Sequence, residues 1–346
     1  MPIKSLTVHN IRSHDQLTVD FSPNVTIITG PNGSGKTSLL EALYIALQGS
    51  SFKGSDNEIL HLDQPWWKID VLFTNDKTRT VKFDPSRSTG RKQFVIDSKT
   101  NYRLPAKLKQ PIVLFDPDDL RLLNGSPARR RQFIDRFISQ LNPLYLTTLR
   151  KYERALKQRN NLLKKIITSP DELFAWDVAI SDYGAYIIEQ RIIFIEQINA
   201  HLNDAYNDIA KSTDTVSVHY SHTFIGDIKQ KLLSELHTHF DRDRALGNTS
   251  AGPHRHDLIF TFNKLPAPST ASRGEVRTIV LALKFLEVDI IEKIFGAQPL
   301  ILLDDVFSEL DLTRQKSLSD TIRTHQIIIT STHVLSDGKD FAHITL

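Results

Sequence analysis

The residues with the clearest chemical meaning form a glycine-rich run that ends in a lysine and hydroxyl side chains: Gly30, Pro31, Asn32, Gly33, Ser34, Gly35, Lys36, Thr37 and Ser38. The run fits the pattern G-x-x-x-x-G-K-[ST] at every defined position. In such a loop, glycines let backbone N–H groups turn toward phosphate oxygens at the start of a helix. Lys36 would reach the β- and γ-phosphates of a nucleotide, and Thr37 would ligate Mg²⁺.

A short apolar stretch that ends in two carboxylates, Leu300–Asp305, supplies the second half of such a site. In ATPases with a phosphate-binding loop, the first carboxylate, here Asp304, holds Mg²⁺, and the second, Asp305, orients or deprotonates the attacking water. We therefore expect Asp305 and Lys36 to be the catalytic residues. Solvated aspartates after a strand would be the simpler interpretation of this pair alone, but the complete phosphate loop favours the catalytic one.

These side chains need a strand before the loop, a helix after it and a strand that presents the acidic pair. The apolar run Val25–Thr29 predicts the first strand, and Ser38–Leu47 predicts the helix. Pro299–Asp305 predicts a buried strand, with a long helix before it over about Gly274–Ile294. A final strand is predicted at Gln326–Thr330.

The helical signal is concentrated in the middle of the chain, from about Ser126 to Lys211, while short β-type runs dominate before it and return after it. We therefore predict an α/β fold, a P-loop ATPase head interrupted by a helical lobe. Its expected parts are residues 1–115 with the phosphate loop, an inserted and mostly helical arm over 116–245, and 246–346 with the acidic pair.

A second phosphate-binding element is predicted at Ser272–Glu275, just before the long helix. The tetrapeptide fits the pattern S-x-G-[EQ], which is the signature of ABC-type ATPases, and it stands about 30 residues before Asp304, where such ATPases place it. There the serine hydroxyl and the glycine N–H bind the γ-phosphate that the other subunit holds. Ser272, Gly274 and Glu275 are accordingly expected to contact the nucleotide of a partner protomer.

Several smaller features leave more than one interpretation open. Ser308–Asp311 stands where a D-loop belongs, and His333 is either a switch histidine that senses the γ-phosphate or a simple loop histidine. The histidines near His237 and His254 lack acidic or cysteine neighbours at metal spacing, so we favour no metal there. Trp66 and Trp67 stand at a strand start and favour packing over function.

Composition limits the class of protein. The chain has 346 residues, no cysteine, no signal-peptide pattern and a formal net charge of only +3. The absence of cysteine excludes disulfides and thiolate metal sites and fits a reducing cytosol. Positive charge is nevertheless concentrated between Arg121 and Lys165, where twelve lysines and arginines face two acids. Such a local excess suits contacts with nucleic-acid phosphates, although any single lysine could belong to a solvated helix face.

Several segments together resemble the RecF family. Asn10–His14 resembles the N-x-R-[SN]-[HY] start shared by Rad50, SMC and RecF ATPases, and Phe115–Asp135 resembles the family stretch F-x-P-[ED]-D-L…G-S-P…R-R…F-[LI]-D. Ala251–Leu258 resembles the motif A-G-P-H-R-D-D-L, with His256 in place of the first aspartate. On these matches, which run in family order, the chain is identified as a member of that family.

The resemblance implies an ABC-type, Rad50/SMC-like head that binds ATP and Mg²⁺, with Arg12 near the nucleotide. It further implies a homodimer that forms on ATP, with Ser272 acting in trans, and slow, DNA-stimulated ATP hydrolysis. The implied partners are double-stranded and gapped or junction DNA, RecR, RecO and, indirectly, RecA, with no membrane. The implied location is cytoplasmic and nucleoid-associated.

Other classes fit the sequence less well. A transporter ATPase would lack the arginine-rich lobe, and an SMC or Rad50 head would need a long coiled coil between its two halves. An OLD-type nuclease would add an acidic nuclease domain. A DNA-binding scaffold without hydrolysis stays open as the non-enzyme alternative, although Lys36, Thr37, Asp304 and Asp305 are all present.

Overall fold

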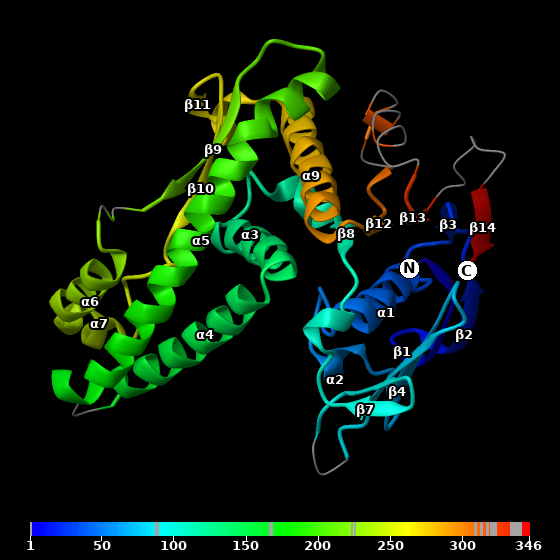
Figure 1. Cartoon of the computed structure of the whole chain (residues 1–346), viewed down its shortest axis with the longest axis horizontal. Helices are drawn as coiled ribbons and strands as arrows, with labels where there is room; N and C mark the ends of the chain where they lie inside the picture. Colours follow the sequence, from blue (N-terminus) through cyan, green and yellow to red (C-terminus); the bar gives the residue numbers. More distant parts are fainter. Residues whose placement is uncertain are drawn as a thin grey trace. The chain divides into compact units, whose positions relative to one another are not determined.

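The computed structural model describes residues 2–86, 90–165, 169–222, 224, 226–307, 310–311, 314–315, 318, 324–332 and 341–346. The chain forms two compact units (Figure 1). The first unit combines Met1–Asp119 with Glu287–Leu346, and the second is Leu120–Leu286. The first unit is therefore built from both ends of the chain, and the second is an insertion.

A five-stranded parallel sheet forms one layer of the first unit, in the order β14-β3-β13-β12-β8. Its central strands are almost wholly apolar and buried, as expected for a parallel sheet covered on both faces. The carboxyl ends of these strands meet at one edge, where α/β folds place their ligands. The strands are β3 (Val25–Thr29), β8 (Ile112–Phe115), β12 (Leu300–Asp304), β13 (Ile327–Ser331) and β14 (Phe341–Thr345).

The other layer is a six-stranded antiparallel sheet in the order β2-β1-β4-β5-β6-β7. Buried residues alternate with more exposed ones along β4, so one face of this sheet covers the core and the other faces outward. Three short helices lie in connecting segments: α2 (Asp56–Ile59) between α1 and β4, η1 (Ala106–Leu108) between β7 and β8, and η2 (Pro117–Arg121) after β8. The strands are β1 (Ile3–Ile11), β2 (His14–Asp20), β4 (Trp67–Phe73), β5 (Thr78–Phe83), β6 (Gln93–Ile96) and β7 (Lys99–Asn101).

Helix α1 (Lys36–Gln48) contacts strands of both sheets and is buried along nearly its whole length. Its position explains why the residues from Leu39 to Leu47 are apolar with the exception of Glu41. The helix ends at Gly49, which adopts φ 93° and donates its N–H to the Ile45 carbonyl at 2.9 Å. A glycine suits this left-handed position because it has no Cβ.

The second unit is mostly helical. Its three longest helices within the unit each begin with a capping side chain followed by proline: Ser126 before α3 (Pro127–Leu141), Asn142 before α4 (Pro143–Leu163) and Ser169 before α5 (Pro170–Ala210). Strand β10 pairs antiparallel with β9 and β11. The remaining elements are β9 (Val216–Ser221), α6 (Ile228–Thr238), α7 (Phe240–Leu246), β10 (Asp257–Phe262), β11 (Leu265–Pro266), α8 (Ala267–Thr270) and α9 (Arg273–Phe295).

The predicted strand, loop and helix around the phosphate loop are confirmed as β3 and α1, and the predicted strand before the acidic pair as β12. One boundary differs from the prediction. We expected the second ATPase segment to begin at residue 246, but 246–286 groups with the inserted unit. The reason is that β10 pairs with β9 and contacts α3, so the chain leaves this unit only within α9. None of the described helices is long and apolar enough to cross a membrane.

Candidate functional site

The phosphate loop has the backbone geometry that its glycines predict. Gly33 and Gly35 adopt φ values of 86° and 91°, in the left-handed region that other residues rarely adopt. At Gly35 space is also short, because a Cβ there would collide with the Ser13 hydroxyl and the His14 ring. The His14 Nε2 atom lies 3.2 Å from the Gly35 carbonyl oxygen. The residues at the turn between β1 and β2 therefore pack against the phosphate loop, and their closeness requires glycine at position 35.

Lys36 lies across its own loop. The residue is only 7% exposed, and its ammonium donates to the carbonyl oxygens of Gly30 at 2.7 Å and Pro31 at 2.9 Å. Phosphate oxygens accept hydrogen bonds as these carbonyl oxygens do, but they carry more negative charge. The Ser34 hydroxyl is buried and has no hydrogen-bond partner among the described residues. Because an unpaired buried hydroxyl costs free energy, a ligand with oxygen acceptors would stabilise this loop.

The structure brings the two predicted metal ligands together. The Thr37 hydroxyl lies 2.7 and 3.0 Å from the two carboxylate oxygens of Asp304, across a separation of 267 residues. Asp304 is 2% exposed and also accepts a hydrogen bond from the Thr330 hydroxyl at 2.9 Å. Hydroxyl and carboxylate oxygens are the ligands that Mg²⁺ prefers. The residues at this sheet edge therefore fit a magnesium ion, which Thr37 and Asp304 would hold.

Asp305, the predicted catalytic carboxylate, stands in the turn directly after β12. Its backbone adopts φ 53°, in the left-handed region. The turn is held by β13, because the Asp305 N–H donates to the carbonyl and hydroxyl oxygens of Thr330 at 3.2 and 3.0 Å. A non-glycine residue in this conformation costs about 1 kcal/mol or more and is often found at functional sites.

Two charged residues that the motifs did not indicate lie beside Asp304. The Lys53 ammonium is 3.4 Å from the Asp304 Oδ2 atom. Asp116 follows β8, the neighbour of β12, and burial raises the pKa of its carboxyl, with further raising by Asp119 and Asp304 and lowering by Lys53. The position of Asp116 after a parallel strand is a signal that sequence reasoning could have used. Lys53 carries no such signal.

Arg12 is close to the loop through a different contact from the expected one. Its guanidinium makes a two-point pair with the Glu41 carboxylate of α1, at 3.1 Å for each contact. The same carboxylate accepts a short hydrogen bond from the Ser51 hydroxyl, which in turn accepts from the Lys53 N–H at 2.8 Å. Arg12 is therefore linked to Lys53 through Glu41 and Ser51. A direct contact of Arg12 with the nucleotide stays a prediction.

The signature residues form a helix start in the second unit. The Ser272 hydroxyl accepts from the Glu275 N–H at 3.3 Å, and the Glu275 carboxylate accepts from the Ser272 N–H at 2.6 Å. This reciprocal arrangement is a capping box that holds the first turn of α9, with Gly274 inside it. Of the predicted D-loop, only Leu310 and Asp311 belong to the described residues. His333 lies outside them.

The basic segment divides into buried and exposed residues. Arg130 makes a two-point pair with Asp257 at 2.7 and 2.8 Å. Arg159 is fully buried and contacts Asp177 and Asp243. These two arginines hold the unit together and are removed from the set of DNA-contact candidates. The exposed cations on α4 are Arg150, Lys151, Arg154 and Lys157.

The histidines of the A-G-P-H-R segment lie inside the second unit. His254 Nδ1 lies 2.5 Å from the Tyr152 hydroxyl, and burial lowers the pKa of His254 to about 4. His256 Nδ1 lies 2.8 Å from the Tyr220 hydroxyl, and its pKa is lowered to about 3 by burial and then by Arg191. Both rings are therefore neutral at pH 7. His256 is therefore a half-buried hydrogen-bond partner of Tyr220.

Comparison with known proteins gives a consistent set of similarities. The model of a family described as "AAA domain" matches residues 5–216. The DNA replication and repair protein RecF of Streptococcus agalactiae is 36% identical over 349 residues, covering 96% of this chain and 92% of that protein. RecF of Agathobacter rectalis is 35% identical over 343 residues, with the same two coverages.

Solved structures resemble the fold over nearly the whole chain. A structure of the recombination mediator protein RecF-ATPrS in the RecFOR pathway has a TM-score of 0.87 at 27% identity and covers 99% of this chain and 95% of its own. A structure of RecF-ATP in the same pathway has a TM-score of 0.85 at 28% identity, covering 97% and 93%. An Smc head domain from Pyrococcus furiosus shares the fold alone, with a TM-score of 0.51 at 16% identity and coverages of 96% and 90%.

Proposed function

Because this chain belongs to the RecF family of DNA replication and repair proteins, we propose that it is an ATP-dependent DNA-binding protein of recombinational repair. Its fold is that of an ABC-type, SMC-like ATPase head. The observation that carries the proposal is the contact between the Thr37 hydroxyl and the Asp304 carboxylate at the end of a glycine loop. That contact joins the two halves of a magnesium-dependent phosphate site.

In the proposed site, the loop from Gly30 to Ser38 holds the nucleotide. Lys36 exchanges its two carbonyl acceptors for oxygens of the β- and γ-phosphates. When bound by Thr37 and Asp304, Mg²⁺ supplies charge neutralisation at the phosphate oxygens. Asp305, fixed by β13, orients the attacking water and accepts its proton. Hydrolysis by such a site is slow and stimulated by DNA.

The proposed active state is a homodimer in which each nucleotide contacts both protomers. Ser272, Gly274 and Glu275 at the start of α9 would contact the γ-phosphate that the partner's loop holds. The capping box supports this role because it fixes the helix N-terminus, whose free N–H groups and dipole favour an anion. Such a pair has twofold symmetry, and hydrolysis releases it by removing the γ-phosphate contacts.

The proposed partners are DNA and the recombination proteins RecR, RecO and, indirectly, RecA. The exposed cations of α4 offer sequence-independent contacts to DNA phosphates, which suit recognition of double-stranded, gapped or junction DNA by shape and charge. The RecFOR pathway named for the similar solved structures supports RecR and RecO as partners. RecA loading is the outcome that the resemblance to the RecF family implies. The proposed location is the cytoplasm, on the nucleoid.

The nucleotide site can be tested by titrating a fluorescent ATP analogue with and without Mg²⁺. Lys36→Met is expected to abolish binding, and Asp304→Asn is expected to abolish the dependence on Mg²⁺. Lys77→Met, at an exposed lysine in the turn between β4 and β5, is the matched control and should bind as the unmodified protein does. Retained affinity in Lys36→Met would refute the assignment of the phosphate loop.

A further inference from the structure

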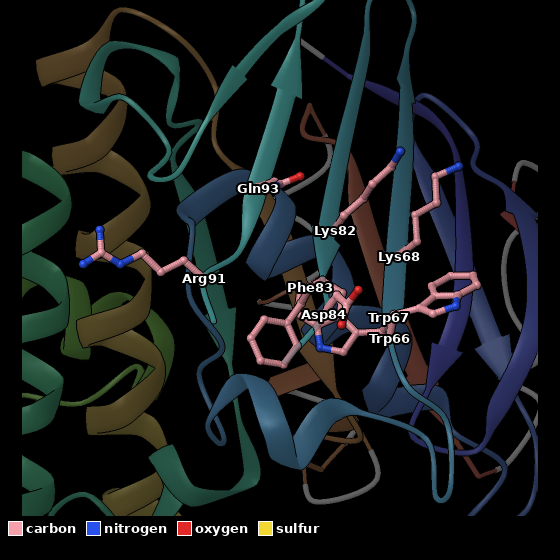
Figure 2. A pocket seen from close by; sticks show the side chains of 8 residues that line it. All are labelled: Trp66, Trp67, Lys68, Lys82, Phe83, Asp84, Arg91 and Gln93. Carbon is pink, nitrogen blue, oxygen red and sulfur yellow. The ribbon is translucent and has the colours of Figure 1, made fainter. Parts of the chain in front are cut away.

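A pocket that the proposed ATPase does not use lies in the first unit, at the antiparallel sheet. Residues of β4, β5 and β6 line it, and its volume is about 240 Å³ (Figure 2). Pockets for drug-sized ligands typically measure about 300–1,000 Å³. This pocket is smaller, so it suits a single flat ring system rather than a complete nucleotide.

Three cations line this pocket, two of them on one side, while Arg91 extends in the opposite direction (Figure 2). Lys68 on β4 lies directly opposite Lys82 on β5, and both side chains run side by side from neighbouring strands (Figure 2). Like charges in such a cross-strand pair repel each other, and the Asp70 carboxylate, 2.6 Å from the Lys68 ammonium, offsets only part of that cost. Among the described residues, the structure shows no ion pair for Lys82 or for Arg91, which also lines the pocket.

The pocket also presents an aromatic face. Trp67 is fully buried, donates its indole N–H to the Asp56 carbonyl at 2.9 Å and stacks on Phe83 at 5.5 Å between ring centroids. Because adjacent residues of a strand point to opposite faces, this anchoring turns Trp66 outward. Trp66 is 41% exposed, with the His9 ring 6.4 Å away on the neighbouring strand.

We propose that this pocket accepts an unstacked base of single-stranded nucleic acid. The base stacks on Trp66, and the flanking phosphates pair with Lys82, Arg91 and Lys68. Aromatic platforms beside cations are the usual means of binding single strands, since every base has a π-face. A duplex would not fit, because its bases are already paired and stacked. Asp84, the one carboxylate among the lining residues, and Asp70, which pairs with Lys68, together do not cancel the three cations.

The inference goes beyond the proposed function and rests on it only for nucleic acid being the partner. Single-strand binding at this pocket needs neither ATP nor the dimer. An acidic peptide with an aromatic side chain would meet the same charges and is treated as a competing outcome of the test. Binding of single strands measured without nucleotide therefore reports on this pocket and not on the ATP-dependent binding of DNA.

The first measurement is fluorescence anisotropy of a short labelled oligothymidylate with the full chain and no ATP. Trp66→Ala should weaken binding about tenfold, the effect of losing one stacked base, while Trp66→Phe should restore most of it. Lys82→Gln should weaken binding and lower the salt dependence by about 0.7 in log–log slope. The matched controls, Tyr102→Ala and Lys77→Gln, alter an exposed aromatic and an exposed lysine elsewhere in the same unit and should change nothing.

A second measurement locates the base directly. An oligonucleotide with 5-iodouracil is irradiated with the protein, and the attachment point is mapped by mass spectrometry. Attachment at Trp66, unaffected by competitor duplex, supports the proposal. Attachment elsewhere, equal affinities for all variants, or displacement by an acidic aromatic peptide in place of DNA overturns it. ATP-dependent binding of gapped DNA that persists in Trp66→Ala shows that such a failure leaves the proposed function intact.

Discussion

Asp304 contacts more of the residues of the proposed nucleotide site than any single motif predicts. Its carboxylate accepts hydrogen bonds from Thr37 and Thr330 and lies beside the Lys53 ammonium, while only 2% of the residue is exposed. A buried carboxylate requires such partners, because an unpaired charge away from water is costly. In the proposed site, a magnesium ion on Asp304 would compete with the groups that already contact its carboxylate.

Lys53 is the competitor whose removal gives the clearest result. Because a cation at 3.4 Å from Asp304 opposes a second cation there, Lys53→Met is expected to lower the Mg²⁺ concentration needed for nucleotide binding. The effect should be about fivefold, which corresponds to about 1 kcal/mol for a partly exposed ion pair. Titration of Mg²⁺ against a fluorescent ATP analogue measures it, with Lys77→Met as the control. A higher magnesium requirement in Lys53→Met would contradict this role.

His256 makes folding sensitive to acid. The pKa of its ring is lowered from 6.5 to about 3, so the unfolded chain binds a proton that the folded chain does not. Stability is therefore complete above pH 6.5 and lost as the pH falls toward 3, with about 2 kcal/mol lost at pH 5. Urea unfolding of His256→Asn should show a smaller difference between pH 7 and pH 5. His201→Asn, at an exposed histidine of α5, should unfold with the same difference as the unmodified protein.

Local spacing was enough to predict that Thr37 and Asp304 meet, while their chemical roles stay predictions. Thr37 and Asp304 each belong to a motif, so their meeting could be predicted from opposite ends of the chain. Lys53 belongs to no motif, and its place beside Asp304 follows only from the path of the segment after α1. Trp66 was expected to pack like Trp67, but Trp66 is 41% exposed while Trp67 is fully buried.

At the scale of elements, the turn between β1 and β2 packs against the phosphate loop and restricts which residues the loop can contain. Gly33 and Gly35 have nearly the same φ, but a Cβ at Gly33 meets open space, while one at Gly35 meets Ser13 and His14. Gly33→Ala should therefore lower the free energy of unfolding by about 1 kcal/mol, the cost of backbone strain alone. Gly35→Ala should lower it further, as measured by urea unfolding. Equal losses would show that the collision relaxes freely.

The regular elements could largely be predicted, because their signals are local. The apolar runs predicted β3, β12 and β13, and the helical signal from about Ser126 to Lys211 predicted the region of α3, α4 and α5. Strand β14 was not predicted, since its residues are mostly half-exposed and its partner β3 lies over three hundred residues earlier. The boundary near residue 287 was missed for a similar reason. The local sequence of β10 or of β9 does not indicate that these two strands pair with each other.

At the scale of the whole molecule, the proposed site is complete only in a dimer. Ser272→Arg should leave binding of the ATP analogue unchanged and prevent ATP-dependent dimerisation, as measured by analytical ultracentrifugation. Ser272 also caps α9, so part of any effect could come from the helix start. Ser269→Arg, on α8 and exposed, adds the same side chain without touching the cap and should dimerise normally. A normal dimer from Ser272→Arg would contradict a site shared between protomers.

The proposed function requires that the bound nucleotide controls the affinity of the protein for DNA. The most direct test is the anisotropy of a labelled gapped duplex titrated with the protein in ATP, in ADP and without nucleotide. We expect tight binding in the presence of ATP and not in the other two conditions, and we expect Lys36→Met to lose it. Replacement of Arg150, Lys151 and Arg154 by glutamate should weaken binding and make its salt dependence shallower. Binding that is the same in all three nucleotide states would contradict it.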